Sequence, residues 1–151
     1  MTYKIVIPIK KKRDGKWNKV PSLNDFIKAE RTTIYTKNGK FLTKGAVMKK
    51  EWQKYMANYI CDCMGKVKIK EPMIMHYHFY EADHRRDWSN CFSTFVKFFE
   101  DSLQECGVIL NDNQRFIKGF TAEFEVDGVN PRTEIEIEVL ENEWGFNPYQ
   151  E

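Results

Sequence analysis

Apolar and polar side chains alternate strictly along residues 73–80, which predicts a β-strand with one buried face. The same two-residue period recurs at residues 134–139, where glutamates alternate with isoleucine and valine. We therefore expect two closing strands, at 121–126 and 132–141, to form a C-terminal β-hairpin. A first strand is expected at residues 3–9.

A helical period governs two other segments. One apolar stripe recurs at spacings of three and four residues: Phe92, Phe95, Val96, Phe99 and Leu103. This stripe predicts a core-facing helix that begins near residues 87–90 and ends before Gly107. Residues 45–64 also predict a helix, and Gly65 is placed to end it.

The order of these elements predicts an α+β fold. We expect a small mixed or antiparallel sheet packed against two main helices. The 151 residues suit one domain, and no long linker or internal repeat divides them. Residues 143–151 are expected to form a flexible tail. The sequence contains no run of about 18 apolar residues, so we expect no membrane span. The basic cluster follows the short apolar stretch at the N-terminus, which is the wrong order for a secretory signal.

Charge is distributed unevenly along the chain, although the net charge is only +2. Residues 1–70 hold 18 Lys and Arg against 5 Asp and Glu, a balance of +13, whereas residues 71–151 hold 6 against 17, a balance of −11. A basic half attracts polyanions, and an acidic half can gather a divalent metal. Two oppositely charged halves that pack together would show the same pattern. The four cysteines contain no CxxC pair, so we expect reduced thiols in a cytoplasmic protein.

Residues 10–22 form a basic loop with an aromatic side chain in it. Its candidate DNA-binding residues are Lys10, Lys11, Lys12, Arg13 and Trp17. Amines can meet phosphates and a ring can stack on a base, so the composition is typical of a nucleic-acid contact. The alternative is a mobile loop whose tryptophan packs on the protein body. A second lysine-rich segment, residues 36–44, has an Asn-Gly turn signal and is a candidate hairpin tip.

The polar segment HRRDWSN, at residues 84–90, lies between the strand at 73–80 and the aromatic helix. Its Asp87, together with Asp112 beyond the helix, offers carboxylates of the kind that hold Mg²⁺. Divalent ions neutralise the charge that develops when a phosphodiester is hydrolysed and lower the pKa of a bound water. Arg85 and Arg86 are candidate contacts to the nucleic-acid backbone.

A structural interpretation of the same residues remains open. Asp87 or Ser89 would serve as an N-cap of the helix, and Asp112 would be an ordinary loop residue. Asp87 and Asp112 are 25 positions apart. They can meet only if the chain folds over or if a second subunit supplies one of them.

Residues 86–114 carry a more specific pattern. RRDWSN is followed by an apolar helix and then by DSLQECGVILNDNQ, and PSLND stands upstream at residues 21–25. Together these segments resemble the signature of RusA-type Holliday junction endodeoxyribonucleases. The similarity covers most of the chain, apart from the basic insert around residues 10–20. It implies a divalent-metal-dependent, structure-selective endonuclease that cleaves branched DNA.

The resemblance also implies roles for particular residues. Asp87 and Asp112 match catalytic, metal-binding aspartates of the family, and Asn90 matches the motif asparagine. Ser89 stands where a further metal-binding aspartate is expected. The helix is about one turn longer than in the shortest family members. If that turn falls early, Lys97 matches a functional lysine and is expected to be catalytic, the favoured alignment; if it falls late, Ser93 takes that position.

Cofactor, partners and setting follow from the same resemblance. It implies Mg²⁺ or Mn²⁺ and no organic cofactor, a four-way DNA junction as substrate, and a homodimer without membrane association. Such an enzyme would act in DNA recombination and repair, encoded by a phage or prophage and working in the cytoplasm of the bacterial host. A catalytically weak branched-DNA-binding protein is the alternative, because serine is a poorer metal ligand than aspartate. A phage structural or adaptor protein with a coincidental motif is a third possibility.

Overall fold

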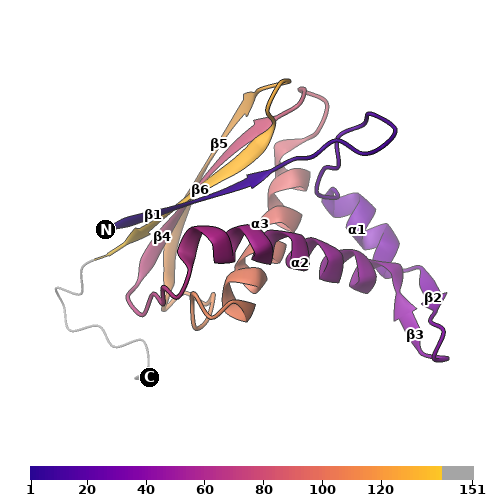
Figure 1. The fold of residues 1–151 in the computed structure, drawn as a ribbon, viewed down its shortest axis with the longest axis horizontal. Coiled ribbons are helices and arrows are strands. Elements are labelled where there is room, and N and C mark those ends of the chain that lie inside the picture. The colour runs from indigo at the N-terminus through magenta and orange to yellow at the C-terminus, as the bar shows by residue number, and fades with distance from the viewer. Residues whose placement is uncertain (141–151) are drawn as a thin grey trace.

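The computed structural model describes residues 1–140, so the flexible tail predicted for residues 143–151 lies outside the described residues. Helices cover one face of a four-stranded sheet, and a two-stranded hairpin projects from the helical layer (Figure 1). In chain order the elements are β1 (Thr2–Pro8), α1 (Leu23–Glu30), β2 (Thr33–Tyr35), β3 (Phe41–Thr43), α2 (Lys44–Met64), β4 (Met73–Glu81), α3 (Trp88–Glu105), β5 (Ile117–Val126) and β6 (Arg132–Val139).

The four-stranded sheet is mixed and has the strand order β1-β6-β4-β5. β6 runs antiparallel to both β1 and β4, whereas β5 runs parallel to β4. Two parallel neighbours need a crossover connection, and α3 supplies it by running back along the sheet from the end of β4 towards the start of β5. The predicted α+β class, with a small sheet on two main helices, is confirmed.

The two closing strands form as predicted, but they flank β4 instead of pairing with each other as a hairpin would. The α3 crossover places β5 against one edge of β4. β6 then takes the other edge, where its buried Ile135 and Ile137 join Ile5 of β1 in the core. Alternation in a sequence specifies which face of a strand is buried, but it does not specify which strand becomes the neighbour.

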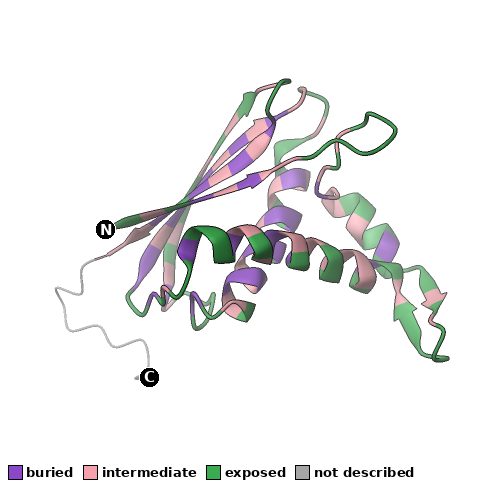
Figure 2. Ribbon diagram, viewed as in Figure 1, coloured by how far each residue is buried: buried purple, intermediate pink, exposed green. Residues whose placement is uncertain are grey.

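The core lies between the sheet and helices α2 and α3. Every second residue of β4 is buried, as its alternation predicts. α3 contributes Phe95, Phe99 and Leu103 of the predicted stripe, and Phe98 is buried beside them (Figure 2). Each such side chain stabilises the fold by about 1.5–3 kcal/mol through removal of apolar surface from water. Among the helices of residues 1–140, none has the length and apolar content that crossing a membrane requires.

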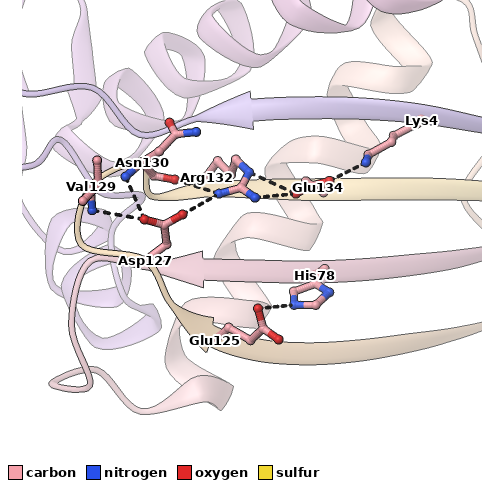
Figure 3. A network of polar contacts seen from close by, with 8 residues as sticks. All are labelled: Lys4, His78, Glu125, Asp127, Val129, Asn130, Arg132 and Glu134. Atoms are coloured by element: carbon pink, nitrogen blue, oxygen red, sulfur yellow. Dashed lines mark hydrogen bonds and ion pairs between the residues drawn. The ribbon is translucent and has the colours of Figure 1, made fainter.

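The opposite face of the sheet is polar and carries a network of ion pairs (Figure 3). Arg132 donates to Asp127 at 3.0 Å and lies 2.9 Å from Glu134, and Glu134 also pairs with Lys4 of β1. Asp127 in turn accepts a hydrogen bond from the backbone of Asn130, which holds the pKa of that carboxyl below its ordinary value. The network therefore ties the turn between β5 and β6 to the β1–β6 pair.

Candidate nucleic-acid interface and acidic sites

The loop between β4 and α3 carries much of the predicted site, and the basic N-terminal loop is attached to it. The Lys19 ammonium lies 3.4 Å from the Asp83 carboxylate. Arg86 donates a hydrogen bond to the carbonyl of Val20. These contacts place the most basic segment of the chain beside the Arg-Arg-Asp segment, although the two are far apart in sequence (Figure 1).

The two arginines of this loop differ in their surroundings. The Arg85 side chain is 87% exposed, so it is accessible to a phosphate. Arg86 is only 23% exposed, and its guanidinium lies 3.6 Å from the buried carboxylate of Glu81. Within residues 1–140, the Nε atom of Arg86 and the Oε2 atom of Glu81 are buried without hydrogen-bond partners. Arg86 therefore holds the loop in place, whereas Arg85 is available for binding.

Asp87 occupies the N-cap position of α3, but its side chain does not cap the helix. Within the described residues its exposed carboxylate has no hydrogen-bond or ion-pair partner. Asp87 therefore takes the N-cap position, but the expectation that its carboxylate caps the backbone N–H groups of α3 is wrong. The positive end of the α3 dipole lies at the same position, which favours anions there.

A cleft of about 240 Å³ opens between this loop and the end of β5. Asp83, Asp87 and His84 line it on the loop side, and Phe124 lines it on the strand side. Trp88, the first residue of α3, is 61% exposed at its edge, and its ring centroid lies 6.2 Å from that of Phe124. The cleft thus combines carboxylates with an exposed aromatic ring.

Asp112 lies in the exposed loop that follows α3, near a second carboxylate. Glu100 of α3 is largely buried, and its Oε1 accepts a hydrogen bond of 3.0 Å from the hydroxyl of Tyr77. The pKa of Glu100 is raised to about 7, chiefly by burial; the charges of Asp112 and Asp101 contribute to the rise, and the Tyr77 hydrogen bond opposes it. Asp112 therefore stands beside an acid that titrates near neutral pH.

Within one protomer the two predicted catalytic aspartates do not meet. Asp87 precedes α3 and Asp112 follows it, and a helix of 18 residues is about 27 Å long at 1.5 Å per residue. Lys97 is exposed in the middle of the same helix, about 15 Å along the axis from Asp87. In a single chain Asp87 and Asp112 therefore lie at opposite ends of α3.

The donor groups around Asp87 suit a hard cation, although one chain supplies few of them. Ser89 and Asn90 lie in the first turn of α3 and offer oxygen atoms, the ligands that Mg²⁺ and Mn²⁺ prefer. Within residues 1–140, no group of three or more His, Cys, Asp or Glu side chains is arranged to hold a metal ion. Mg²⁺ commonly takes one or two carboxylates and completes its shell with water and phosphate oxygens. The residues present fit such an ion once a second chain or a nucleic acid adds ligands.

The basic loop is a short ribbon. The backbone N–H of Lys12 donates to the carbonyl of Lys16 at 2.7 Å, and Lys11 forms a β-bridge with Trp17. The Lys11 ammonium lies 4.9 Å from the centroid of the Trp17 ring, a cation–π contact. Arg13 lies near the tip and is exposed, and Lys12 and Lys10, at the base of the ribbon, are exposed as well. Trp17 is thus half-buried under a lysine of its own loop.

The sequence did not predict that Glu100 has a raised pKa or that Asp101 binds side chains of α2. Lys49 and Gln53 of α2 both contact the Asp101 carboxylate, at 2.8 and 3.4 Å, so Asp101 joins the two main helices. Glu100 lies at the edge of the α3 stripe, next to Phe99, where a carboxylate is partly drawn into the core. Its position at the border of the apolar stripe was the only feature of the sequence that could have indicated a partly buried carboxylate.

No protein-family model matches the chain, and no curated protein matches it. The resemblance to RusA-type enzymes therefore depends on the motif residues alone.

Proposed function

We propose that this protein is a divalent-metal-dependent endonuclease of the RusA type that cleaves branched DNA as a homodimer. The observation that carries the proposal is the unpartnered Asp87 carboxylate at the start of α3, beside an attached basic loop. A carboxylate without a structural partner is available to a cation. The neighbouring amines of the basic loop are available to the phosphates on which that cation would act.

A homodimer would complete the acidic site. Two copies of α3 related by a perpendicular twofold axis run antiparallel, so the start of one helix lies beside the end of the other. Asp87 would then approach Asp112 of the partner subunit, and the same axis would generate a second, identical site. Two symmetric sites match the pair of strands that a four-way junction offers for cutting.

The remaining residues have separate tasks in this proposal. Asp87, with Asn90 and Ser89, would hold the ion, which when bound neutralises phosphate charge and lowers the pKa of a water. Arg85 and the basic loop would hold the DNA backbone. Lys97 would meet the backbone along the exposed side of α3. Because these contacts are electrostatic, DNA affinity should fall steeply as salt concentration rises.

Cleavage of a synthetic four-way junction with Mg²⁺ tests the activity, with linear duplex of the same sequence as the reference substrate. Asp87→Asn and Asp112→Asn should each abolish cutting while junction binding persists. Asp62→Asn, an exposed acid on α2, is the matched control and should cut normally. Full activity in both Asp87→Asn and Asp112→Asn would exclude the proposed site.

Mixing the two inactive variants tests the shared site directly. A heterodimer of Asp87→Asn with Asp112→Asn has both substitutions in one composite site and leaves the other composite site intact. The mixture should therefore recover nicking of one strand. Sites built within single protomers would give no recovery.

A DNA-binding protein with weak catalysis is the second candidate, favoured by Ser89 and by the lack of a three-ligand group within residues 1–140. Such a protein would bind the junction at low salt without cutting it. Ser89→Asp adds an anionic ligand next to Asp87 and should then produce or increase Mg²⁺-dependent cleavage.

A further inference from the structure

The β2–β3 hairpin presents a pair of aromatic rings to solvent. Tyr35 and Phe41 are direct cross-strand neighbours, 73% and 64% exposed, with ring centroids 4.3 Å apart. Leu42, the next residue along β3, is 40% exposed on the opposite face of the ribbon. The hairpin extends beyond the helices and is mostly exposed (Figures 1 and 2). Two large rings held in contact with each other and exposed to solvent mark a candidate interaction site.

Hydrogen bonds hold the hairpin in one shape. At the turn, the backbone N–H of Thr36 donates to the carbonyl of Lys40 at 3.1 Å, and the Thr36 hydroxyl binds the backbone of Lys40. At the base, the N–H of Lys44 donates to Thr32 at 2.7 Å. Thr43, the last residue of β3, also caps α2 with its side chain. The ring pair is therefore fixed on a short ribbon that continues directly into a long helix.

The charge around the rings favours nucleic acid as their partner. Residues 31–50 contain six Lys and Arg and no Asp or Glu. Lys37 and Lys40 lie in the turn itself, next to the exposed rings. Amines that meet phosphates and flat rings that stack on bases form the usual combination in proteins that bind unpaired nucleic acid.

We infer that the β2–β3 hairpin selects branched DNA by stacking the Tyr35–Phe41 pair on bases exposed at the branch point. The inference rests on the proposed function, since it takes branched DNA as the ligand. In a continuous duplex a ring can reach a base face only by separating stacked base pairs, which costs free energy. At a branch point the stacking of one arm on another can be broken without separating base pairs within a continuous duplex, so the same ring pair reaches base faces at a lower cost. Lys37 and Lys40 bind flanking phosphates in either DNA form.

Binding measured without cleavage tests the inference. Fluorescence anisotropy in Ca²⁺ would give Kd for a four-way junction, carrying 2-aminopurine at the branch, and for linear duplex. Tyr35→Ala with Phe41→Ala should weaken junction binding by about ten- to a hundredfold, from the loss of base stacking. Duplex binding should change by less than about twofold, and the 2-aminopurine response should disappear. Tyr35→Phe keeps the ring and should keep both properties.

Two controls separate stacking from other effects. Val129→Ala removes an apolar side chain that is 91% exposed in the turn between β5 and β6, and should leave both affinities unchanged. Lys37→Ala with Lys40→Ala should weaken junction and duplex binding by the same factor. All the substituted side chains are exposed, and an unchanged thermal melt confirms that each variant is folded.

The outcomes for the hairpin and for the nuclease are distinguishable. The double alanine variant overturns the inference if it binds the junction as tightly as the wild type, or if it loses duplex and junction affinity equally. A wild-type protein that prefers junctions through the hairpin but does not cut them in Mg²⁺ removes only the nuclease proposal. A wild-type protein that binds neither DNA removes the inference as well, and the rings then belong to a protein-docking surface.

Discussion

Replacing Glu100 with glutamine should make the protein more stable at pH 8 and leave it nearly unchanged at pH 5. Burial raises the pKa of Glu100 from its ordinary value of 4.5 to about 7, with Asp112 and Asp101 adding to the effect. The folded protein therefore keeps a proton on Glu100 that the unfolded chain loses. Stability falls as pH rises from about 4.5 to 7, by about 3–4 kcal/mol if each pH unit corresponds to about 1.4 kcal/mol.

Glutamine carries no charge at any pH and can still accept the hydrogen bond from the Tyr77 hydroxyl. Urea unfolding at pH 5, 6, 7 and 8 would give the free energy of unfolding for both proteins. The difference between Glu100→Gln and wild type should grow across this range and level off above pH 7. Glu105→Gln, an exposed residue of the same helix, is the matched control and should follow the wild type.

A constant difference between Glu100→Gln and wild type across pH 5–8 would refute the reasoning. It would mean that Glu100 remains ionised in the folded protein throughout this range. Carboxyls such as Asp127, whose pKa is lowered in the folded protein, make stability fall as the solution becomes more acidic, but they affect both proteins equally. For this reason the difference between the variants is the quantity to compare.

Three further outcomes follow from the fold. Phe98→Ala should lower the free energy of unfolding by about 3–5 kcal/mol in urea titrations, because the ring is fully buried; a loss under about 1 kcal/mol would contradict its place in the core. Ser22→Ala should cost about 1 kcal/mol, because its hydroxyl accepts from the Asp25 N–H at the start of α1, and an unchanged urea midpoint would argue against this cap. The sulfurs of Cys61 and Cys106 lie 3.7 Å apart, so mild oxidation should join them. Thiol counting should then find two free cysteines instead of four, and finding four would exclude the pairing.

Local patterns predicted most of the elements. The alternation at β4 and β6 and the aromatic stripe of α3 each state which side chains are buried, because a strand or helix can hide only one regular set of positions. The pairing of the closing strands was less predictable. β4 separates β5 from β6, and strand order depends on contacts between segments far apart in the chain.

The candidate site was predictable as residue types but not as an arrangement. Asp87 and Arg85 lie together in an exposed loop, as their clustering in the sequence suggests. The orientation of Arg86 depends on a buried partner, Glu81, that no local pattern identifies. The raised pKa of Glu100 likewise depends on burial under β4 and on the charge of a distant loop.

The sequence by itself determined the secondary structure of the main elements, the separation of basic and acidic halves, and the positions of the aspartates relative to α3. These properties depend on nearest neighbours and on composition. The tertiary structure alone decided that α3 spans the sheet between its two aspartates and that the basic loop adjoins Asp83. A parallel β4–β5 pair requires its connecting helix to run back along the strands, and this requirement carries Asp87 and Asp112, which flank α3 in sequence, to opposite ends of the sheet.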